Sequence, residues 1–222
     1  MKGFLYFCTC VLLCVSCAHT GSAAKYPNKL ADIDPFSIGL TSASLDQTFS
    51  SKVKATDVEV IFYPRENEVA LEFNLGQSQY RQFWNEAGRR LFIEAFGKYK
   101  EDFANRELLT NFNRSRAIYG KFTGRFLWKT LSFSATYSSS PVIQLGYRFR
   151  EGSPYFSASQ RKAKEETGFN RMGISESPAY SLYFTRAQGE ELLSLFDQAF
   201  LLGLLKDSST QVTDTAERDE YF

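Results

Sequence analysis

The fold is decided first by residues 57–74, DVEVIFYPRENEVALEFN. In the first part Val58, Val60 and Phe62 alternate with more polar neighbours, and residues 69–74 repeat the alternation. This period of two is typical of a β-strand with one buried face. Residues 64–68, PRENE, have the composition of a turn. The stretch therefore predicts an antiparallel hairpin of strands 57–63 and 69–74.

A helix is expected directly after this hairpin. Asn74 can cap it, and Gln77 follows three residues later, an arrangement related to a capping box. Apolar residues then recur at spacings of three and four, which predicts one helix face packed on a sheet. These residues are Tyr80, Phe83, Trp84, Ala87, Leu91, Phe92, Ala95, Phe96, Tyr99 and Phe103.

The second half of the chain returns to strand patterns. Strands are expected at 117–122, 125–137, 142–150 and 180–184, where β-branched and aromatic residues are frequent. The apolar parity changes within 125–137, which predicts a β-bulge near Lys129 and Thr130. Residues 151–177 are polar and resemble a loop. A capping box from Thr185 to Gln188 opens a second helix, whose apolar face is Leu192, Leu195, Phe196, Ala199, Phe200, Leu202 and Leu205.

Together these patterns predict an α+β fold: an antiparallel sheet of about 6–7 strands packed against two long amphipathic helices. We expect four segments. These are a signal peptide (1–16), a lipidated N-terminus with a flexible tether (17–54), a single α+β domain (55–206) and an acidic disordered tail (207–222). Within the tether, residues 36–40 could form one short strand.

The N-terminus has the features of an export signal. Lys2 is followed by the apolar run GFLYFCTCVLLCV at residues 3–15, which is shorter than the roughly 20 residues of a membrane-spanning helix. Ser16 and Cys17 end this run, with Cys14 where lipoboxes usually carry leucine. The segment resembles the relaxed lipobox of spirochaete lipoprotein precursors. That resemblance implies cleavage before Cys17, acylation of its thiol and a bacterial membrane anchor, most simply in the outer membrane facing the periplasm. Cleavage after Ala24, giving a soluble periplasmic or secreted protein, is the alternative.

Most catalytic chemistry is not supported by the residues present. The chain has one histidine, His19, beside the lipidation site, so the expected domain contains no Ser-His-Asp triad and no histidine metal ligand. No phosphate-binding loop is present, and we expect no cofactor and no metal. A pair of carboxylates, Glu59 and Glu72, lies on the two arms of the first hairpin. Such a pair is the minimum requirement of a glycoside hydrolase.

The overall charge of +1 hides an uneven distribution along the chain. Residues 114–171 hold eleven Lys or Arg against three Glu, a net of +8, whereas residues 172–222 hold three against nine, a net of −6. Four cations, Arg125, Lys129, Arg148 and Arg150, fall on the predicted strands. We expect them to face solvent, either as a partner-binding surface for an anionic envelope component or as an ordinary solvated face.

These observations favour a non-catalytic binding or scaffolding lipoprotein of the cell envelope. Its expected partners are membrane lipid, through acylated Cys17, and an anionic envelope component or an envelope protein. Nucleic acid is not an expected partner of an exported protein. Two other classes remain open: a periplasmic carrier of a small apolar or lipid ligand, in view of the 16% aromatic content, and a carboxylate-dependent hydrolase.

Overall fold

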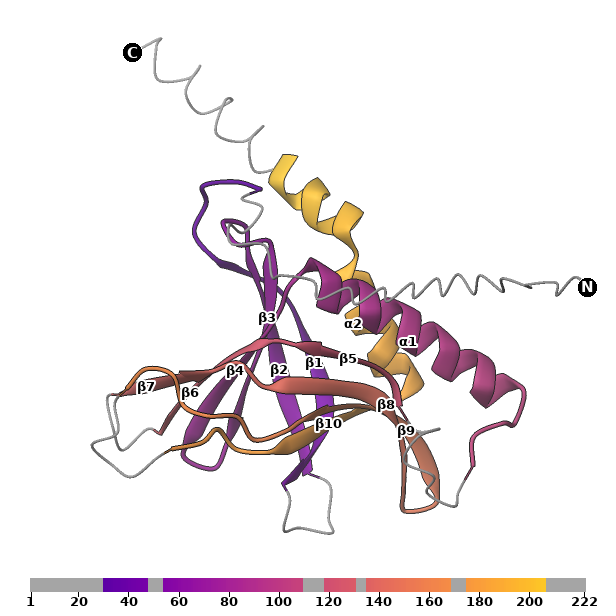
Figure 1. Cartoon of the computed structure of the whole chain (residues 1–222). Coiled ribbons are helices and arrows are strands. Elements are labelled where there is room, and N and C mark those ends of the chain that lie inside the picture. Colours follow the sequence, from indigo (N-terminus) through magenta and orange to yellow (C-terminus); the bar gives the residue numbers. More distant parts are fainter. Residues whose placement is uncertain (1–29, 48–53, 110–117, 131–134, 169–174, 207–222) are drawn as a thin grey trace, which may run out of the picture.

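The computed structural model describes residues 30–47, 54–109, 118–130, 135–168 and 175–206. Within these ranges the chain forms one ten-stranded sheet and three helices (Figure 1). The strands are β1 (Phe36–Gln47), β2 (Lys54–Tyr63), β3 (Glu68–Leu75), β4 (Ser78–Trp84), β5 (Ile118–Thr123), β6 (Arg125–Thr130), β7 (Thr136–Ser139), β8 (Val142–Arg150), β9 (Ser153–Gln160) and β10 (Tyr180–Phe184). The helices are α1 (Glu86–Ala104), α2 (Arg186–Phe196) and a further helix at 198–206.

The sheet is antiparallel throughout, in the order β5-β8-β9-β10-β1-β2-β3-β4-β6-β7. The expectation of an α+β fold with 6–7 strands and two long helices was wrong. The protein is mostly β, with a strongly curled sheet and three short helices. The first hairpin, β2–β3, was predicted correctly, as were β8 and β10.

The helix expected after Asn74 is instead a strand. Asn74 and Leu75 end β3, and Gly76 turns the chain with a φ of +61°, a conformation that favours glycine. β4 then pairs with β3, and α1 begins only at Glu86, where the Asn85 side chain accepts a hydrogen bond from the Gly88 amide at 2.8 Å. The spacing of aromatic residues in 80–84 fits both a strand and the first turn of a helix, which caused the error.

Two further strands lie in segments expected to be irregular. β1 occupies residues 36–47, inside the expected tether, and pairs with both β2 and β10 near the middle of the sheet. β9 occupies residues 153–160, inside the expected 151–177 loop. Both strands are rich in serine and contain alanine, and β1 also contains a glycine. Because such residues have little intrinsic preference for strands, these two strands form through pairing with their neighbours.

The second half of the sheet is built on one long bent hairpin. A single residue, Gly124, separates β5 from β6, and Ser140 and Pro141 separate β7 from β8. β5 pairs with β8 and β6 with β7, so the two pairs are halves of the same hairpin. The Gly124 amide donates to the Pro141 carbonyl at 3.1 Å where the halves meet. Because one half pairs with β9 and the other with β4, this hairpin joins the two ends of the sheet.

No bulge is needed to explain the change of parity in residues 125–137. β6 ends at Thr130 and β7 starts at Thr136, and the register pairs Trp128 with Tyr137. Register partners in antiparallel strands point to the same face, so an even-numbered and an odd-numbered aromatic residue share a face across the hairpin. The predicted bulge near Lys129 and Thr130 was therefore wrong.

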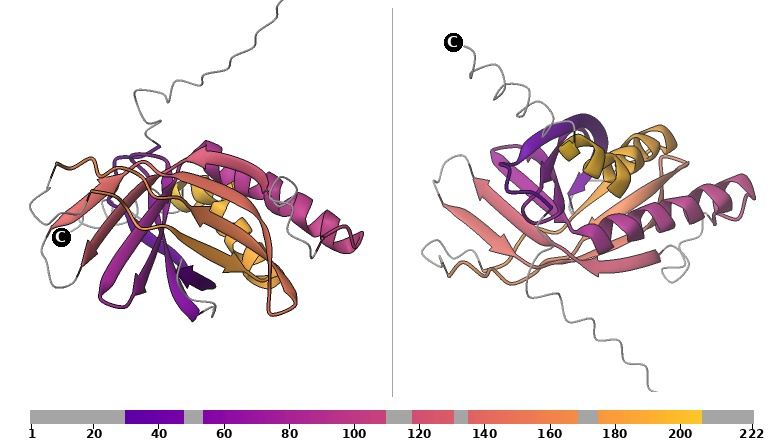
Figure 2. Two further views of the ribbon diagram at one scale, coloured as in Figure 1. Left: turned by 60° about the horizontal axis from the view of Figure 1, so that its bottom comes forward. Right: turned by 90° about the horizontal axis from the view of Figure 1, so that it is seen from above.

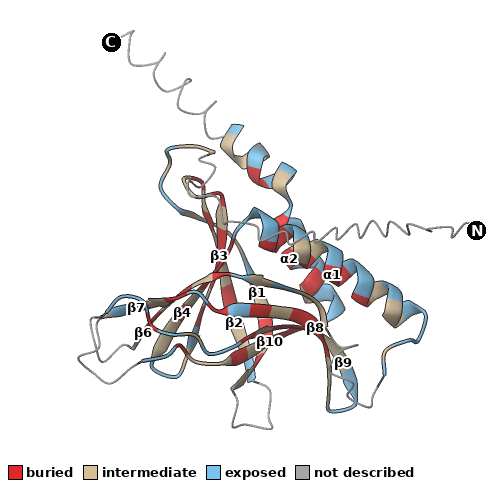
Figure 3. Cartoon of the chain, viewed as in Figure 1, coloured by how far each residue is buried: buried red, intermediate tan, exposed pale blue. Residues whose placement is uncertain are grey.

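The curl gives the sheet an inner and an outer face. Gln82 on β4 donates to the Tyr180 hydroxyl on β10 at 2.9 Å and to Gln160 on β9 at 3.1 Å, although β4 stands several strands away from both. Phe73 and Phe126 also contact the Tyr180 ring. These contacts cross the interior, so this face is concave. Phe73, Phe126 and Tyr180 belong to the buried hydrophobic core. Figure 3 shows in red where the buried residues lie along the strands and helices.

The helices cover one end of the inner face (Figure 2). α1 packs on β5, β8 and β4, while α2 packs on β1, β10 and β9. Phe92 of α1 lies at the centre of this contact, with ring centroids 5.3 Å from Phe156 and 5.1 Å from Phe196. Burying such large aromatic side chains contributes about 2–3 kcal/mol each.

A buried arginine connects the helices to the sheet. Arg89 is 1% exposed and donates to the main-chain carbonyls of Asn67 at 2.7 Å and Trp84 at 3.0 Å. It also donates to the Gln198 side chain at 2.5 Å, which fixes the start of the third helix. Burial lowers the pKa of Arg89 to about 10, so the group stays charged at neutral pH and needs these partners.

Candidate functional site

The outer face of β8, β9 and β10 carries an unusual concentration of small polar side chains. The register aligns Gln144, Ser159 and Ser181 in one row across the three strands, and Gly146 with Ser157 in the next. Ser159 and Ser181 share a hydrogen bond at 2.8 Å. Because these side chains are short, the surface here is hollowed into a groove with a cavity volume of about 330 Å³.

Two arginines line the same groove. Arg161 directly follows β9. With the Gln144 amide turned so that its oxygen faces Arg161, the guanidinium donates two hydrogen bonds to that oxygen, 3.1 and 3.2 Å long. Arg148 on β8 donates to the Tyr183 hydroxyl at 3.2 Å. We call this site the serine–arginine groove and define it by Gln144, Arg148, Ser157, Ser159, Arg161 and Ser181.

The two arginines enter the groove from opposite ends. Arg148 is in register with Tyr155 on β9. Arg161 follows Tyr155 by six residues, just after the end of β9. At about 3.3 Å per residue, their backbone positions are roughly 20 Å apart along the strand direction. The side chains reach inward from these positions, with the serine floor between them.

Arg150, the neighbour of Arg148 on the same face, is held by a carboxylate. It forms an ion pair with Asp46 of β1 and donates to the Tyr183 hydroxyl at 2.9 Å. The two side chains of the ion pair are 22% and 11% exposed. This cation is therefore neutralised within the fold, beside the groove.

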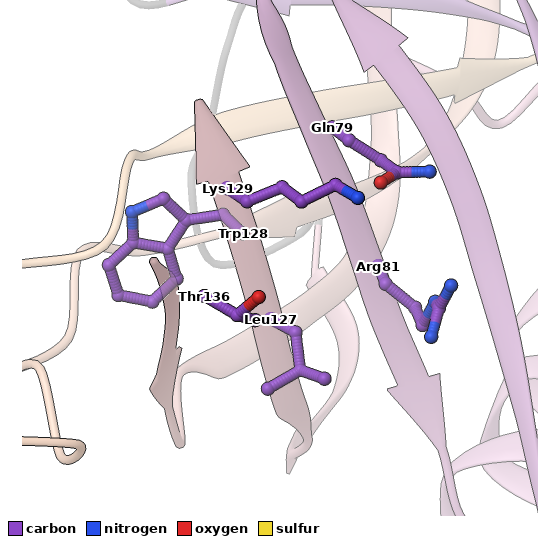
Figure 4. A pocket seen from close by; sticks show the side chains of 6 residues that line it. All are labelled: Gln79, Arg81, Leu127, Trp128, Lys129 and Thr136. Atoms are coloured by element: carbon purple, nitrogen blue, oxygen red, sulfur yellow. The ribbon is translucent and has the colours of Figure 1, made fainter. Parts of the chain in front are cut away.

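The other two predicted cations lie on β6, in the opposite half of the bent hairpin. Arg125 pairs with Glu68 at 2.5 Å, and its guanidinium carbon lies 3.5 Å from the centroid of the Phe83 ring. Lys129 lines a smaller pocket of about 80 Å³, where it extends toward Gln79 of β4 (Figure 4). The four predicted residues are thus not gathered in one site. Arg148 lines the groove, and Arg150 lies next to it.

Near Lys129, two ion pairs lie on the outer face of β3, β4 and β6. Arg81 forms an ion pair with Glu72, and it donates to the Tyr63 hydroxyl at 2.8 Å. The pKa of Tyr63 is raised, mainly by burial, and Arg81 opposes the rise. We call Glu68, Glu72, Arg81 and Arg125 the paired-charge region.

The carboxylate pair considered from the sequence does meet in the register, where Glu59 is opposite Glu72. Glu72 is 13% exposed, and it accepts hydrogen bonds from both Arg81 and Gln79. These contacts already use its two oxygens in holding neighbouring strands together.

Sequence reasoning missed Arg161 and the serines of the floor because it treated residues 151–177 as a loop. The signal was present in residues 156–161, FSASQR, where Phe156, Ala158 and Gln160 alternate with smaller or charged residues. In the structure the first three are buried on the inner face, and the other three face the groove.

Several predictions concern residues that the structure does not describe. The signal peptide, Cys17, His19 and the acidic tail all lie outside the described residues. Among the residues that are described, no three His, Cys, Asp or Glu side chains are grouped as metal ligands. None of the helices in the described ranges combines the length and the apolar character needed to cross a bilayer.

A comparison with protein families gives one match over most of the fold. The model of a family described as an uncharacterised Treponema protein matches residues 35–202, from the start of β1 into the third helix. The chain therefore belongs to this family. No curated protein and no solved structure matches it.

Proposed function

We propose that this member of the Treponema family is a lipid-anchored envelope protein that binds an anionic envelope component through the serine–arginine groove. It acts as a binding or scaffolding module without catalysis. Acylation of Cys17, which resembles the modified cysteine of a spirochaete lipobox, would attach it to the membrane. A two- or three-chain lipid anchor is effectively permanent.

The observation that carries the proposal is the placement of Arg148 and Arg161 over a floor of hydroxyl and amide groups. Guanidinium groups bind carboxylates and phosphates through charge-assisted, often bidentate hydrogen bonds. The volume of about 330 Å³ is at the lower end of the range for ligand sites. No ion pair of Arg161 with a carboxylate is found among the described residues.

The binding test uses the full chain, solubilised in detergent, on an immobilised heparin column as a generic polyanion. The double variant Arg148→Gln/Arg161→Gln should elute at clearly lower salt than the wild type. The matched control, Arg90→Gln/Lys54→Gln, removes two exposed cations outside the groove and should elute close to the wild type. Equal shifts for both variants would show that net charge alone retains the protein, and would contradict the proposal.

The anchor is tested separately by metabolic labelling with palmitate. Label should enter the wild-type chain and be absent from Cys17→Ala. Label that persists in Cys17→Ala would refute lipidation at this residue, whatever the outcome of the binding test.

A further inference from the structure

We propose that the ligand of the serine–arginine groove is an acidic glycan whose two anionic groups bind Arg148 and Arg161 while its hydroxyls contact the serine floor. This inference rests on the proposed function and names the chemical class of its ligand. It draws on three features of the groove. These are the separation of its two arginines, the hydroxyl and amide groups of its floor, and the position of β8, β9 and β10 as interior strands of the sheet.

The separation of the cations favours an extended ligand. The backbone positions of Arg148 and Arg161 are roughly 20 Å apart along the strands. An extended arginine side chain spans about 6–7 Å, so the two guanidinium groups stay at least about 6–8 Å apart even when both reach fully inward. A chain with repeating anionic groups can reach both cations at once. The second contact then forms at a high effective concentration.

The floor between the cations matches sugar hydroxyls. Ser159 and Ser181 lie 2.8 Å apart, and each hydroxyl both donates and accepts. Gln144 is oriented by the two hydrogen bonds that its side-chain oxygen accepts from Arg161, which directs its amide donors away from that guanidinium. A row of donors and acceptors between two cations is complementary to a polyhydroxylated chain with acidic groups.

An acidic peptide fits the same surface less well. Extended peptides commonly bind to sheets by pairing with the backbone of an edge strand. β8, β9 and β10 are interior strands, and each is paired with a neighbour on both sides. The floor therefore offers a ligand side chains only.

Galacturonate oligomers of one to four units provide defined probes, with maltotetraose as the neutral control. Binding to the full chain in detergent is measured by isothermal titration calorimetry. We expect affinity to rise at least tenfold from monomer to tetramer, and maltotetraose not to bind. Arg148→Gln and Arg161→Gln should each reduce tetramer affinity to near that of the monomer, because either variant leaves one anionic contact.

The alternative outcomes separate the two proposals. Equal affinity for monomer and tetramer, lost in both arginine variants, would overturn the extended glycan while supporting an anion site. Tighter binding of hexaglutamate than of tetragalacturonate would identify an acidic protein partner and also overturn it. Failure of every anion, together with unchanged heparin elution of the double variant, would refute the proposed function itself. Arg161 is exposed, so Arg161→Gln keeps the test decisive if Arg148→Gln does not fold.

Discussion

Two cationic regions lie on the outer face of the same sheet, and they differ in what surrounds each arginine. In the paired-charge region Arg81 is matched by Glu72 and Arg125 by Glu68. In the serine–arginine groove, Arg148 donates to a hydroxyl and Arg161 to a neutral amide. The two regions occupy opposite halves of one bent hairpin and its neighbouring strands.

The difference separates structural cations from binding cations. A partly buried arginine facing a carboxylate already has its charge compensated, and removing either partner leaves the other charge uncompensated. Arg161, for which the described residues show no ion pair with a carboxylate, keeps its positive potential available to an incoming anion. We therefore expect substitutions in the paired-charge region to change stability and those in the groove to change binding.

The largest effect should come from Gly124, where the bent hairpin joins the two regions. A Cβ at this position would lie 2.9 Å from the Phe83 carbonyl oxygen and 2.7 Å from the Ile143 side chain. The backbone oxygen cannot move without shifting β4, so Gly124→Val should lower the free energy of unfolding by about 3 kcal/mol. Urea unfolding followed by tryptophan fluorescence measures this change.

Gly97, on the exposed side of α1, provides the control. A Cβ added there would have no atom within 4 Å, so Gly97→Ala should leave stability unchanged or raise it by up to about 1 kcal/mol. A Gly124→Val variant as stable as the wild type would show that the bend tolerates a side chain. It would contradict the expectation that Gly124 links the stability of the two regions.

The next largest effect is expected in the paired-charge region. Glu72→Gln leaves the Arg81 guanidinium, 33% exposed, without its counter-charge, and should cost about 2 kcal/mol of stability. Arg161→Gln in the groove should change stability by less than about 0.5 kcal/mol. Urea midpoints of the two variants make the comparison. Equal losses would contradict the division into structural and binding cations.

How far the fold could be predicted from sequence is shown by two similar segments, 71–77 and 182–188. Both have the pattern Leu-x-Phe, a capping residue and then Gln three residues later. At Thr185 the capping box forms as predicted and α2 follows. At Asn74 the chain turns into β4, because Gly76 adopts a positive φ and 78–84 pairs with both β3 and β6. The capping pattern is similar in the two segments, so Gly76 and tertiary pairing decide between them.

The candidate site was predictable only in part, for a related reason. The period-two pattern of residues 142–150 alternates Arg148 and Arg150 with apolar residues, and in β8 the two arginines lie on the face opposite Ile143 and Leu145. It could not show that Asp46, about a hundred residues earlier in the chain, neutralises Arg150. That contact depends on β1 standing beside β10, a long-range pairing that no local pattern encodes.

The next prediction has a smaller expected effect. It uses a substitution that gives the groove an ion pair like those of the paired-charge region. Gln144→Glu places a carboxylate where Arg161 now donates to an amide oxygen, and compensates that cation. Affinity for tetragalacturonate should fall about tenfold, equivalent to about 1.4 kcal/mol. Stability should be unchanged or slightly higher. Calorimetric titration and urea unfolding of the same sample measure both quantities, and undiminished affinity would mean that Arg161 does not contact the ligand.

The smallest expected effect is a change in the pH dependence of stability, and it comes from the phenol of Tyr63, which contacts Arg81 of the paired-charge region. Burial raises its pKa above the ordinary value of 10.0, so the folded state holds this proton more tightly than the unfolded state. The resulting stability is complete below about pH 10 and is lost as pH rises through the folded pKa. Tyr63→Phe should therefore lose less stability between pH 9 and about 11 than the wild type, as measured by urea midpoints. Arg81 opposes the rise in pKa, so Arg81→Gln should raise the pKa of Tyr63 further and steepen the alkaline loss. If Arg81→Gln leaves the alkaline slope unchanged, its charge does not act on Tyr63, and the cation is less tightly integrated into this region than its contacts indicate.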